Sequence, residues 1–322
     1  MVCLIAGIIL LAVALIQDIS GSGAGWRGPA LIIGAIGILL GMYLFPTLKH
    51  HRSIVNFIFV FPLLFTFVVT VIIPLCLGVF YSFTDWNGIK MTGFVGFANY
   101  KAMFSEPSFL WSLIITILFV VLNMVLVNVV AFMLALLCTS KVKGLSFFRA
   151  SYFLPNLIGG IVLGYIWQLI FDGIFEKFDL ALKLSAKLGF WGLVILICWQ
   201  QIGYMMIVYI AGLQAIPGSL NEAAMIDGAN KWQRLIHVTI PNMMPSITIC
   251  TFLTITNSFK LFDQNLSLTG GEPMHQTEMM ALNIYDTFYG RVGYEGVGQA
   301  KAVIFFIIVV AIGMIQLYAT KS

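Results

Sequence analysis

The amino-acid sequence predicts an all-α protein, a polytopic transmembrane helical bundle with about eight spans. Three observations indicate this fold class. Hydrophobic residues make up 60% of the chain and charged residues 9%, whereas soluble domains carry about 25% charged residues. The mean hydropathy is +1.00. The apolar residues are also gathered in runs, several of which reach the roughly 20 residues that a helix needs to cross a bilayer.

Two candidate spans come first and six follow, and we expect the last six to form one core. In chain order they are Val2–Ile16, Pro29–Phe45, Ile54–Phe80, Phe109–Cys138, Tyr152–Ile170, Phe190–Leu213, Met243–Phe262 and Val303–Leu317. This order predicts a first part, residues 1–53, with two transmembrane helices and a basic cytoplasmic loop. A transmembrane domain is predicted over residues 54–322.

The first candidate span could also be the apolar part of a signal peptide. It lacks a basic segment before it, and Ser20 to Ala24 is a poor cleavage site. We therefore expect this segment to be retained as a span.

Short basic loops predict the orientation of the chain. Segments 49–52 and 141–149 contain Lys, Arg and His but no acidic residue, and cytoplasmic loops are enriched in Lys and Arg. If the spans alternate, both segments lie on the same side as the loop that contains Glu222. We therefore predict cytoplasmic termini and a cytoplasmic Glu222 loop in a multi-pass membrane protein.

The loop over residues 216–245 is the longest polar-bearing segment on this side. Ser219 and Glu222 have the spacing of a capping box, which predicts the start of a short helix. Gly228 accepts the left-handed conformation that ends a helix. A helix of about two turns is marginal in water, so we expect it to be held between the membrane domain and a partner protein.

A second short helix is predicted after Gly228, which we expect to be the hinge between the two helices. Asn230 and Gln233 repeat the cap spacing. Pro241 is expected to end the helix at Ile240, because the residue before a proline avoids the helical region.

This loop resembles the EAA loop of permease subunits of binding-protein-dependent ABC importers, at the positions Glu222, Ala223, Ala224, Asp227, Gly228, Ala229 and Pro241. In that family the loop is a coupling helix that docks on the ATPase subunit. The resemblance therefore implies these partners: a second homologous permease, two ATP-binding subunits, and an extracytoplasmic sugar-binding protein. It implies no cofactor in this chain, with ATP and Mg²⁺ on the partner ATPases. An ordinary capped cytoplasmic loop is the alternative interpretation.

Further segments resemble the sugar-permease branch of the family, namely Phe94–Tyr100, Leu154–Asn156, Tyr165–Gln168, Phe259–Asp263 and Leu268–Pro273. Two positions depart from its pattern: Ile115–Thr116 replaces an Asn-Thr pair, and Glu272 interrupts Gly-Gly-Pro. The resemblance covers the chain from about residue 54, and the two preceding spans are similar to an addition in maltose-type permeases.

Polar and small residues inside apolar spans face the protein interior or a water-filled path. We expect Asn123 and Asn128 to hydrogen-bond between helices. Gly159, Gly160 and Gly164 are small enough to permit close helix packing.

Amides, hydroxyls and aromatic rings gather in the sixth and seventh spans, and this mixture suits a sugar. The predicted substrate-binding residues are Gln200, Gln201, Tyr204, Asn257, Ser258 and Asp263. In the resembling maltose-type permeases the sugar site lies on the corresponding spans. The alternative for these residues is hydrogen bonding between helices. Lys260 and Asp263, three residues apart on a helix, could neutralise each other.

No catalytic or nucleotide-binding motif accompanies these features. The sequence has no P-loop, no plausible set of catalytic carboxylates or nucleophiles, and five cysteines that stand singly in apolar stretches. The net charge of +4 gives no reason to expect nucleic-acid binding. We therefore predict a transport protein that is not an enzyme and draws its energy from a partner. A secondary transporter driven by an ion gradient is the alternative, but it would show intramembrane acidic residues and inverted repeats.

Overall fold

The structure, a computed structural model, describes residues 2–19, 26–44, 51–139 and 144–319. Helices dominate it, which confirms the predicted all-α class. The strands among the described residues form one antiparallel hairpin, β1 (Thr84–Trp86) with β2 (Met91–Phe94). The chain divides into two compact units, Met1–Leu77 and Gly78–Ser322, whereas the sequence suggests a division after residue 53.

The first unit contains a tightly packed pair of helices, α1 (Val2–Ile19) and α2 (Arg27–Tyr43). A β carbon on Gly41 would lie 2.6 Å from that of Leu4, so only a glycine allows this approach. The chain then forms α3 (His51–Phe67), a π-helical turn (Val68–Ile72) and α4 (Ile73–Tyr81). Of the two predicted basic loops, residues 49–50 and 141–143 lie outside the described residues.

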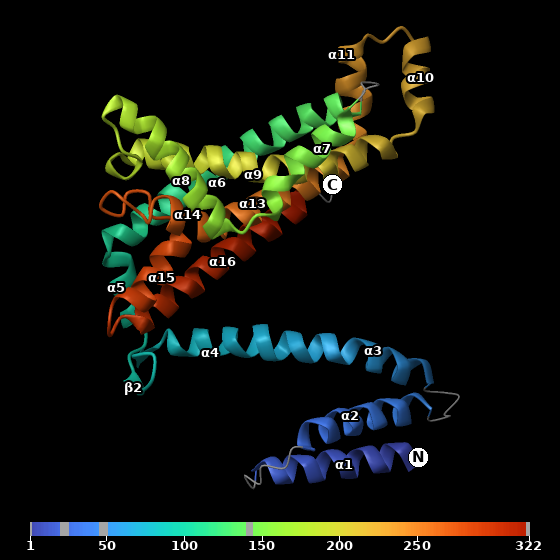
Figure 1. The fold of residues 1–322 in the computed structure, drawn as a ribbon, viewed down its shortest axis with the longest axis vertical. Coiled ribbons are helices and arrows are strands. Elements are labelled where there is room, and N and C mark those ends of the chain that lie inside the picture. The colour runs from blue at the N-terminus through green and yellow to red at the C-terminus, as the bar shows by residue number, and fades with distance from the viewer. Residues whose placement is uncertain (1, 20–25, 45–50, 140–143, 320–322) are drawn as a thin grey trace. The chain divides into compact units, whose positions relative to one another are not determined.

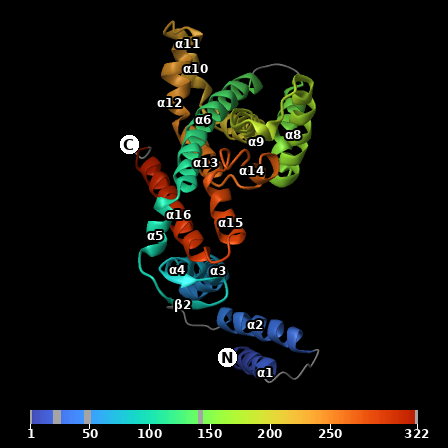
Figure 2. The same ribbon diagram turned by 90° about the vertical axis from the view of Figure 1, so that its left-hand side faces the viewer.

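The second unit holds most of the remaining helices and their short connections (Figure 1). The elements before the predicted cytoplasmic loop are α5 (Ala98–Ser105), α6 (Pro107–Cys138), α7 (Leu145–Phe153), the 3₁₀ turn η2 (Leu154–Leu157), α8 (Gly160–Phe175), two further 3₁₀ turns (Glu176–Phe178 and Leu182–Leu184) and α9 (Ala186–Ala215). The elements that follow are α10 (Gly218–Ile226), α11 (Lys231–Arg234), the π-helical turn η5 (Leu235–Thr239), α12 (Ile240–Asn242), α13 (Met244–Phe259), α14 (Asp263–Leu268), α15 (Met280–Gly290) and α16 (Glu295–Ala319). Within this unit α10 and α11 project from one end and α5 lies at the other (Figure 2).

Among the residues that the structure describes, four helical stretches are long and apolar enough to cross a membrane: Val55–Tyr81, Pro107–Cys138, Ala186–Ala215 and Glu295–Gln316. Two bent helix pairs raise the number to six, and α1 and α2 supply shorter apolar helices. Each of the eight predicted spans therefore overlaps a helical segment of the described chain, while Phe45 lies outside the described residues.

Two of the predicted spans are not straight helices. The span predicted at Tyr152–Ile170 is bent by 104°, and the one at Met243–Phe262 continues a helix from which it is bent by 69°. At the first bend Pro155 removes a backbone donor and Gly159 interrupts the helix with an extended conformation. These bends decide which side chains meet near the middle of the unit.

The core of the second unit forms where α6, α9 and α13 pack together. Two polar contacts cross it: Asn123 Nδ2 donates to Ser258 Oγ over 2.7 Å, and Tyr209 Oη donates to Asn128 Oδ1 over 2.7 Å. Both asparagines thus hydrogen-bond between helices, as predicted.

Glycines bring several helices into backbone contact. A β carbon on Gly164 would lie 1.8 Å from Ser267 Oγ, and one on Gly160 would lie 2.7 Å from the Asp263 β carbon. The predicted packing role is confirmed for these two glycines but is wrong for Gly159, whose surroundings are open. The tightest crossing is at Gly203, where a β carbon would lie 1.7 Å from the Tyr152 carbonyl oxygen.

Candidate functional site

A polar cavity of about 230 Å³ lies where η2, α9, α13 and α14 meet. Five of its eight lining residues carry a carboxamide group. The lining consists of Asn156, Ile197, Gln200, Gln201, Asn257, Lys260, Leu261 and Gln264. The structure therefore brings together three of the predicted substrate-binding residues, Gln200, Gln201 and Asn257.

Local helix geometry explains why these side chains converge. Ile197, Gln200 and Gln201 have the spacing of neighbours on one face of α9. The other long wall, from Asn257 to Gln264, runs over the end of α13 and the start of α14. Asn156 completes the cavity from η2, next to the bend at Pro155.

The carboxamides of the cavity are partly ordered by one another. Gln264 Nε2 donates to Gln200 Oε1 over 2.7 Å. Gln201 is only 8% exposed, and its Oε1 has no hydrogen-bond partner among the described residues. Burying an unpaired acceptor costs about 1–3 kcal/mol. This oxygen is enclosed as well as unpaired, so a ligand in the cavity reaches it once a neighbouring side chain moves.

Lys260 adds a positive charge to the cavity. It is exposed, and the structure shows no ion pair between it and Asp263 in the described chain. The predicted neutralisation is wrong because α13 ends at Phe259 and the chain turns before α14 begins. The two residues therefore do not share the face of one helix.

The other predicted substrate-binding residues lie outside the lining. Tyr204 is half-buried and packs against the apolar cluster around Met205 and Tyr209. Ser258 is fully buried and accepts its hydrogen bond from Asn123. Asp263 is exposed and lies against Gly160 of α8. Their contact with a substrate remains a prediction.

Sequence reasoning missed Asn156 and Gln264 and interpreted Lys260 differently. Residues 257, 260, 261 and 264 repeat the helical spacing of 197, 200, 201 and 204. This repeat does not indicate a shared helix face, because α13 ends at Phe259 and α14 begins at Asp263. Asn156 belongs to a segment that was noted only for its resemblance.

The loop over residues 216–245 presents a short, exposed helix. α10 contains no buried residue, and Met225 and Ile226 expose 59% and 86% of their surface. Glu222, Ala223 and Asp227 are also exposed, while Ala224 and Ala229 are half-buried. A helix with exposed apolar side chains on this scale indicates a protein interface.

Gly228 ends this helix in the left-handed conformation, with φ at +81°. The Ala229 amide donates to the Ala224 carbonyl over 2.9 Å, and the Gly228 amide donates to the Met225 carbonyl over 3.1 Å. These two bonds form a Schellman motif, which satisfies carbonyls at the helix end. The hinge predicted at Gly228 is confirmed.

The predicted helix caps of this loop are partly wrong. Asn230 and Gln233 do form a capping box. Ser219 does not cap α10, because the helix begins one residue earlier, at Gly218. The second short helix of the loop also does not end at Ile240, because it continues through Pro241 to Asn242. The π-helical turn over Leu235–Thr239 loosens the backbone ahead of Pro241, which helps the helix to accommodate a proline.

A second polar cluster ties α6, α15 and α16 together. Lys301 is fully buried on α16 and donates to Asn283 Oδ1 and Thr287 Oγ1 of α15, over 2.8 and 2.7 Å. Glu106, the residue before α6, pairs with both Lys301 and Arg291. Burial tends to raise the pKa of Glu106, but hydrogen bonds from the two cations outweigh this and lower it. No local sequence pattern predicts this cluster, because its members lie far apart along the chain.

Comparisons with known proteins agree that the chain is similar to the membrane components of transport systems. The family described as binding-protein-dependent transport system inner membrane component matches residues 33–320. The probable starch degradation products transport system permease protein AmyD of Thermoanaerobacterium thermosulfurigenes is 45% identical over 273 residues, which cover 82% of this chain and 93% of that protein. The multiple sugar-binding transport system permease protein MsmF of Streptococcus mutans is 30% identical over 263 residues, which cover 77% and 89% of the two chains.

The fold has a solved counterpart. The crystal structure of a bacterial ABC transporter involved in the import of the acidic polysaccharide alginate contains a similar chain, with a TM-score of 0.74. The match covers 85% of this chain and 97% of that chain. At 16% sequence identity, the likeness is one of fold.

Proposed function

Because the chain belongs to the family of binding-protein-dependent transport system inner membrane components, we propose that it is the transmembrane permease subunit of an ATP-driven importer for a carbohydrate. It is a multi-pass protein of the plasma membrane. The family is one of transport permeases, and the proposal assigns no enzymatic reaction to this chain. Family membership also decides against the secondary transporter driven by an ion gradient.

The amide-lined cavity carries the proposal. Each hydroxyl of a sugar donates one hydrogen bond and accepts others, and a carboxamide offers both kinds of partner. The free acceptor of Gln201 and the amides of Asn156 and Asn257 match this demand. The cavity of about 230 Å³ is smaller than most small-molecule sites, about 300–1,000 Å³. It therefore fits one part of an oligosaccharide, with the partner permease supplying the other wall.

The relatives support the same class of substrate. AmyD is described as a permease for starch degradation products and MsmF as one for multiple sugars. Short glucose oligomers are therefore the first substrates to test. The role of each lining residue in this proposal rests on its position in the cavity.

The proposed importer contains further subunits. The exposed apolar surface of α10 fits a docking site for an ATP-binding subunit, and two such subunits would hold ATP and Mg²⁺. A second, homologous permease and an extracytoplasmic sugar-binding protein complete the complex. The related alginate transporter has been crystallised with a periplasmic protein that carries an alginate pentasaccharide, which supports the last of these partners.

In the proposed importer, a helical path links the α10 docking surface to the cavity. α11, η5 and α12 follow the Gly228 hinge as one helical path and lead into α13, which contributes Asn257 to the cavity. In the proposed mechanism, closure of the ATPases displaces α10, and this path moves α13 with it. The walls of the cavity then shift relative to each other and admit sugar from the outer side.

The experiment is to reconstitute the whole importer in proteoliposomes and measure ATP hydrolysis and uptake with a panel of solutes. We expect oligosaccharides from starch to stimulate both, and amino acids and inorganic ions to stimulate neither. Uptake that follows an imposed ion gradient without ATP would contradict the proposal. So would ATP hydrolysis that no carbohydrate stimulates.

A further inference from the structure

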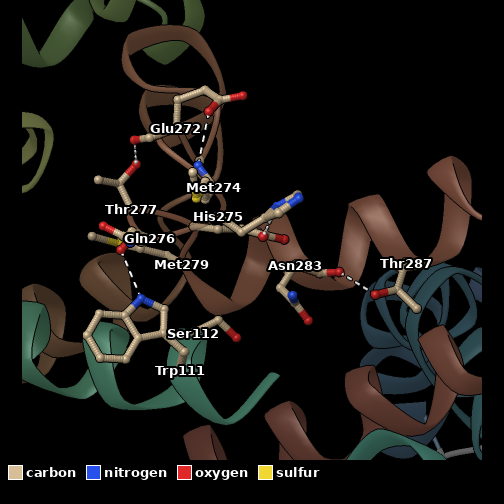
Figure 3. A network of polar contacts seen from close by, with 12 residues as sticks. Trp111, Ser112, Glu272, Met274, His275, Gln276, Thr277, Met279, Asn283 and Thr287 are labelled. Carbon is tan, nitrogen blue, oxygen red and sulfur yellow. Dashed lines mark hydrogen bonds and ion pairs between the residues drawn. The ribbon is translucent and has the colours of Figure 1, made fainter. Parts of the chain in front are cut away.

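A cluster of potential metal ligands lies outside the sugar cavity, between the loop after α14 and helix α15. His275, Glu278 and Asp286 each offer one ligand atom, and these atoms all lie within 4.8 Å of one another. His275 Nδ1 is 2.5 Å from Glu278 Oε2. Figure 3 shows the imidazole of His275 reaching from the loop toward the start of α15, where Asn283 lies.

The two carboxylates of this cluster are shielded from solvent. Glu278 is only 2% exposed, and Asp286 is half-buried. Burial, together with the nearby Asp286 carboxylate, raises the pKa of Glu278, and burial also raises that of Asp286. Desolvated carboxylates so close together repel each other unless a cation lies between them.

The nearby cationic groups serve this purpose only in part, because His275 lies against Glu278 and Arg291 acts on Asp286 while it pairs with another residue. Arg291 and Lys301 both pair with Glu106, and Lys301 gives its other hydrogen bonds to Asn283 and Thr287. His275 exposes 58% of its side chain. A divalent cation at this point would supply the positive charge that two neighbouring carboxyl groups favour.

We propose that His275, Glu278 and Asp286 bind a divalent transition-metal ion, with Zn²⁺ as the best-fitting member of the class. The imidazole nitrogen favours Zn²⁺ over Ca²⁺ and Mg²⁺, which prefer oxygen ligands. Zinc sites with three protein ligands take water or another group in the fourth position. Bond lengths of about 2.0–2.2 Å place the ligand atoms of tetrahedral zinc roughly 3.4 Å apart. To reach that spacing, His275 Nδ1 and Glu278 Oε2 must move apart from 2.5 Å, and ligand atoms up to 4.8 Å apart must approach each other. His275 is on an exposed loop, which permits this adjustment.

The metal would add a direct link between the loop and α15, which are each hydrogen-bonded to α6. Trp111 Nε1 of α6 donates to the Gln276 carbonyl over 3.0 Å, and Thr277 Oγ1 donates to the Glu272 carbonyl over 2.7 Å (Figure 3). The loop is therefore fixed to α6 and to itself. A metal ion bound by His275 and Asp286 would fix it to α15 as well.

The test uses the complete importer, purified without a histidine tag, stripped with a chelator and titrated with Zn²⁺ and with Co²⁺. We compare wild type with Glu278→Gln, which preserves shape, with His275→Ala, which changes an exposed side chain, and with His237→Ala. The last is the matched control, because His237 is exposed in η5, far along the chain from the cluster. The readouts are bound Zn²⁺ by equilibrium dialysis, the Co²⁺ absorption spectrum, and the thermal unfolding midpoint with and without Zn²⁺.

We expect wild type and His237→Ala to bind one more Zn²⁺ per complex than the two cluster variants, or to bind it at least about tenfold more tightly. Zn²⁺ should raise the unfolding midpoint of wild type but not of Glu278→Gln. Equal Zn²⁺ binding by wild type and both cluster variants would overturn the proposal and leave a simple His275–Glu278 ion pair. Binding of Ca²⁺ as tight as that of Zn²⁺ would overturn the assigned metal class.

Discussion

Lys301 and Glu106 form an ion pair between the start of α6 and the buried face of α16, with 2.6 Å between Lys301 Nζ and Glu106 Oε2. Lys301 is fully buried, although it lies within an apolar helical stretch that is long enough to cross a membrane. Its ammonium group also binds two side chains of α15. One side chain thereby holds three helices together.

Removing only the cation of this pair should be strongly destabilising. Lys301→Met leaves the Glu106 carboxylate without its buried partner, and breaking a buried pair costs about 3–5 kcal/mol. We expect a clear fall in the thermal unfolding midpoint of the purified complex. The double variant Lys301→Met with Glu106→Gln should recover part of the loss. A single variant as stable as wild type would show that the pair contributes nothing.

The same pair predicts how stability depends on pH. The folded state lowers the pKa of Glu106 below its ordinary value of 4.5, with Lys301 and Arg291 as the causes that outweigh burial. A carboxylate of this kind stabilises the fold above its unfolded pKa, and the contribution is lost as pH falls through the folded pKa. Glu106→Gln should therefore be less stable than wild type at pH 7. The difference in unfolding midpoint should shrink as the pH falls below about 4.5, and a gap that stayed constant would contradict this origin.

The sugar cavity predicts a ranking of substitutions. Gln201→Leu removes the free acceptor at little cost to folding, since Oε1 has no partner among the described residues. One lost hydrogen bond of about 1.4 kcal/mol corresponds to a roughly tenfold higher KM for oligosaccharide uptake. Asn257→Ala should act similarly, and Tyr204→Ala less, because Tyr204 lies outside the lining.

Gln214→Leu is the matched control for this ranking. Gln214 lies on the same helix, is exposed, and does not line the cavity. Its KM should equal that of wild type. If Gln214→Leu and Gln201→Leu raise KM equally, the cavity is not the sugar site.

The Gly228 hinge can be tested with one substitution at two sites. Gly228→Pro forces φ from +81° to about −65°, so α10 should leave its position and sugar-stimulated ATP hydrolysis should be lost. Gly218→Pro is the control, because Gly218 is the first residue of α10, where proline is tolerated. Both variants should insert in the membrane, since the spans satisfy their own backbone hydrogen bonds. Normal coupling in Gly228→Pro, with all subunits present, would refute the role of the loop.

The predicted orientation is checked by labelling introduced cysteines in a background without the native ones. Lys187 and Lys231 are both exposed and are predicted to lie on opposite sides of the membrane. Membrane-impermeant reagent applied outside intact cells should therefore label Lys187→Cys and spare Lys231→Cys. Labelling of both positions from the same side would show that the orientation is wrong.

The sequence was informative wherever the pattern is local. Apolar runs indicated the spans, Gly228 indicated the end of one short helix, and Asn230 indicated the start of the next. An apolar run in the sequence does not show where its helix bends. The meeting of Asn156, Asn257 and Gln264 around one cavity therefore could not be predicted from their spacing alone. Contacts such as Lys301 with Glu106 depend on which helices pack together, and no local pattern determines that.

The crossing of Tyr152 and Gly203 limits how the sequence can diverge over evolutionary time. Even the methyl group of alanine at 203 would coincide with a main-chain oxygen, so a substitution there requires α7 and α9 to separate. Side chains that face lipid have no such restriction and can exchange with other apolar residues. Members of the family that retain this crossing should therefore retain a glycine at the equivalent position. That glycine provides a fixed reference for aligning the spans of members as distant as 16% identity.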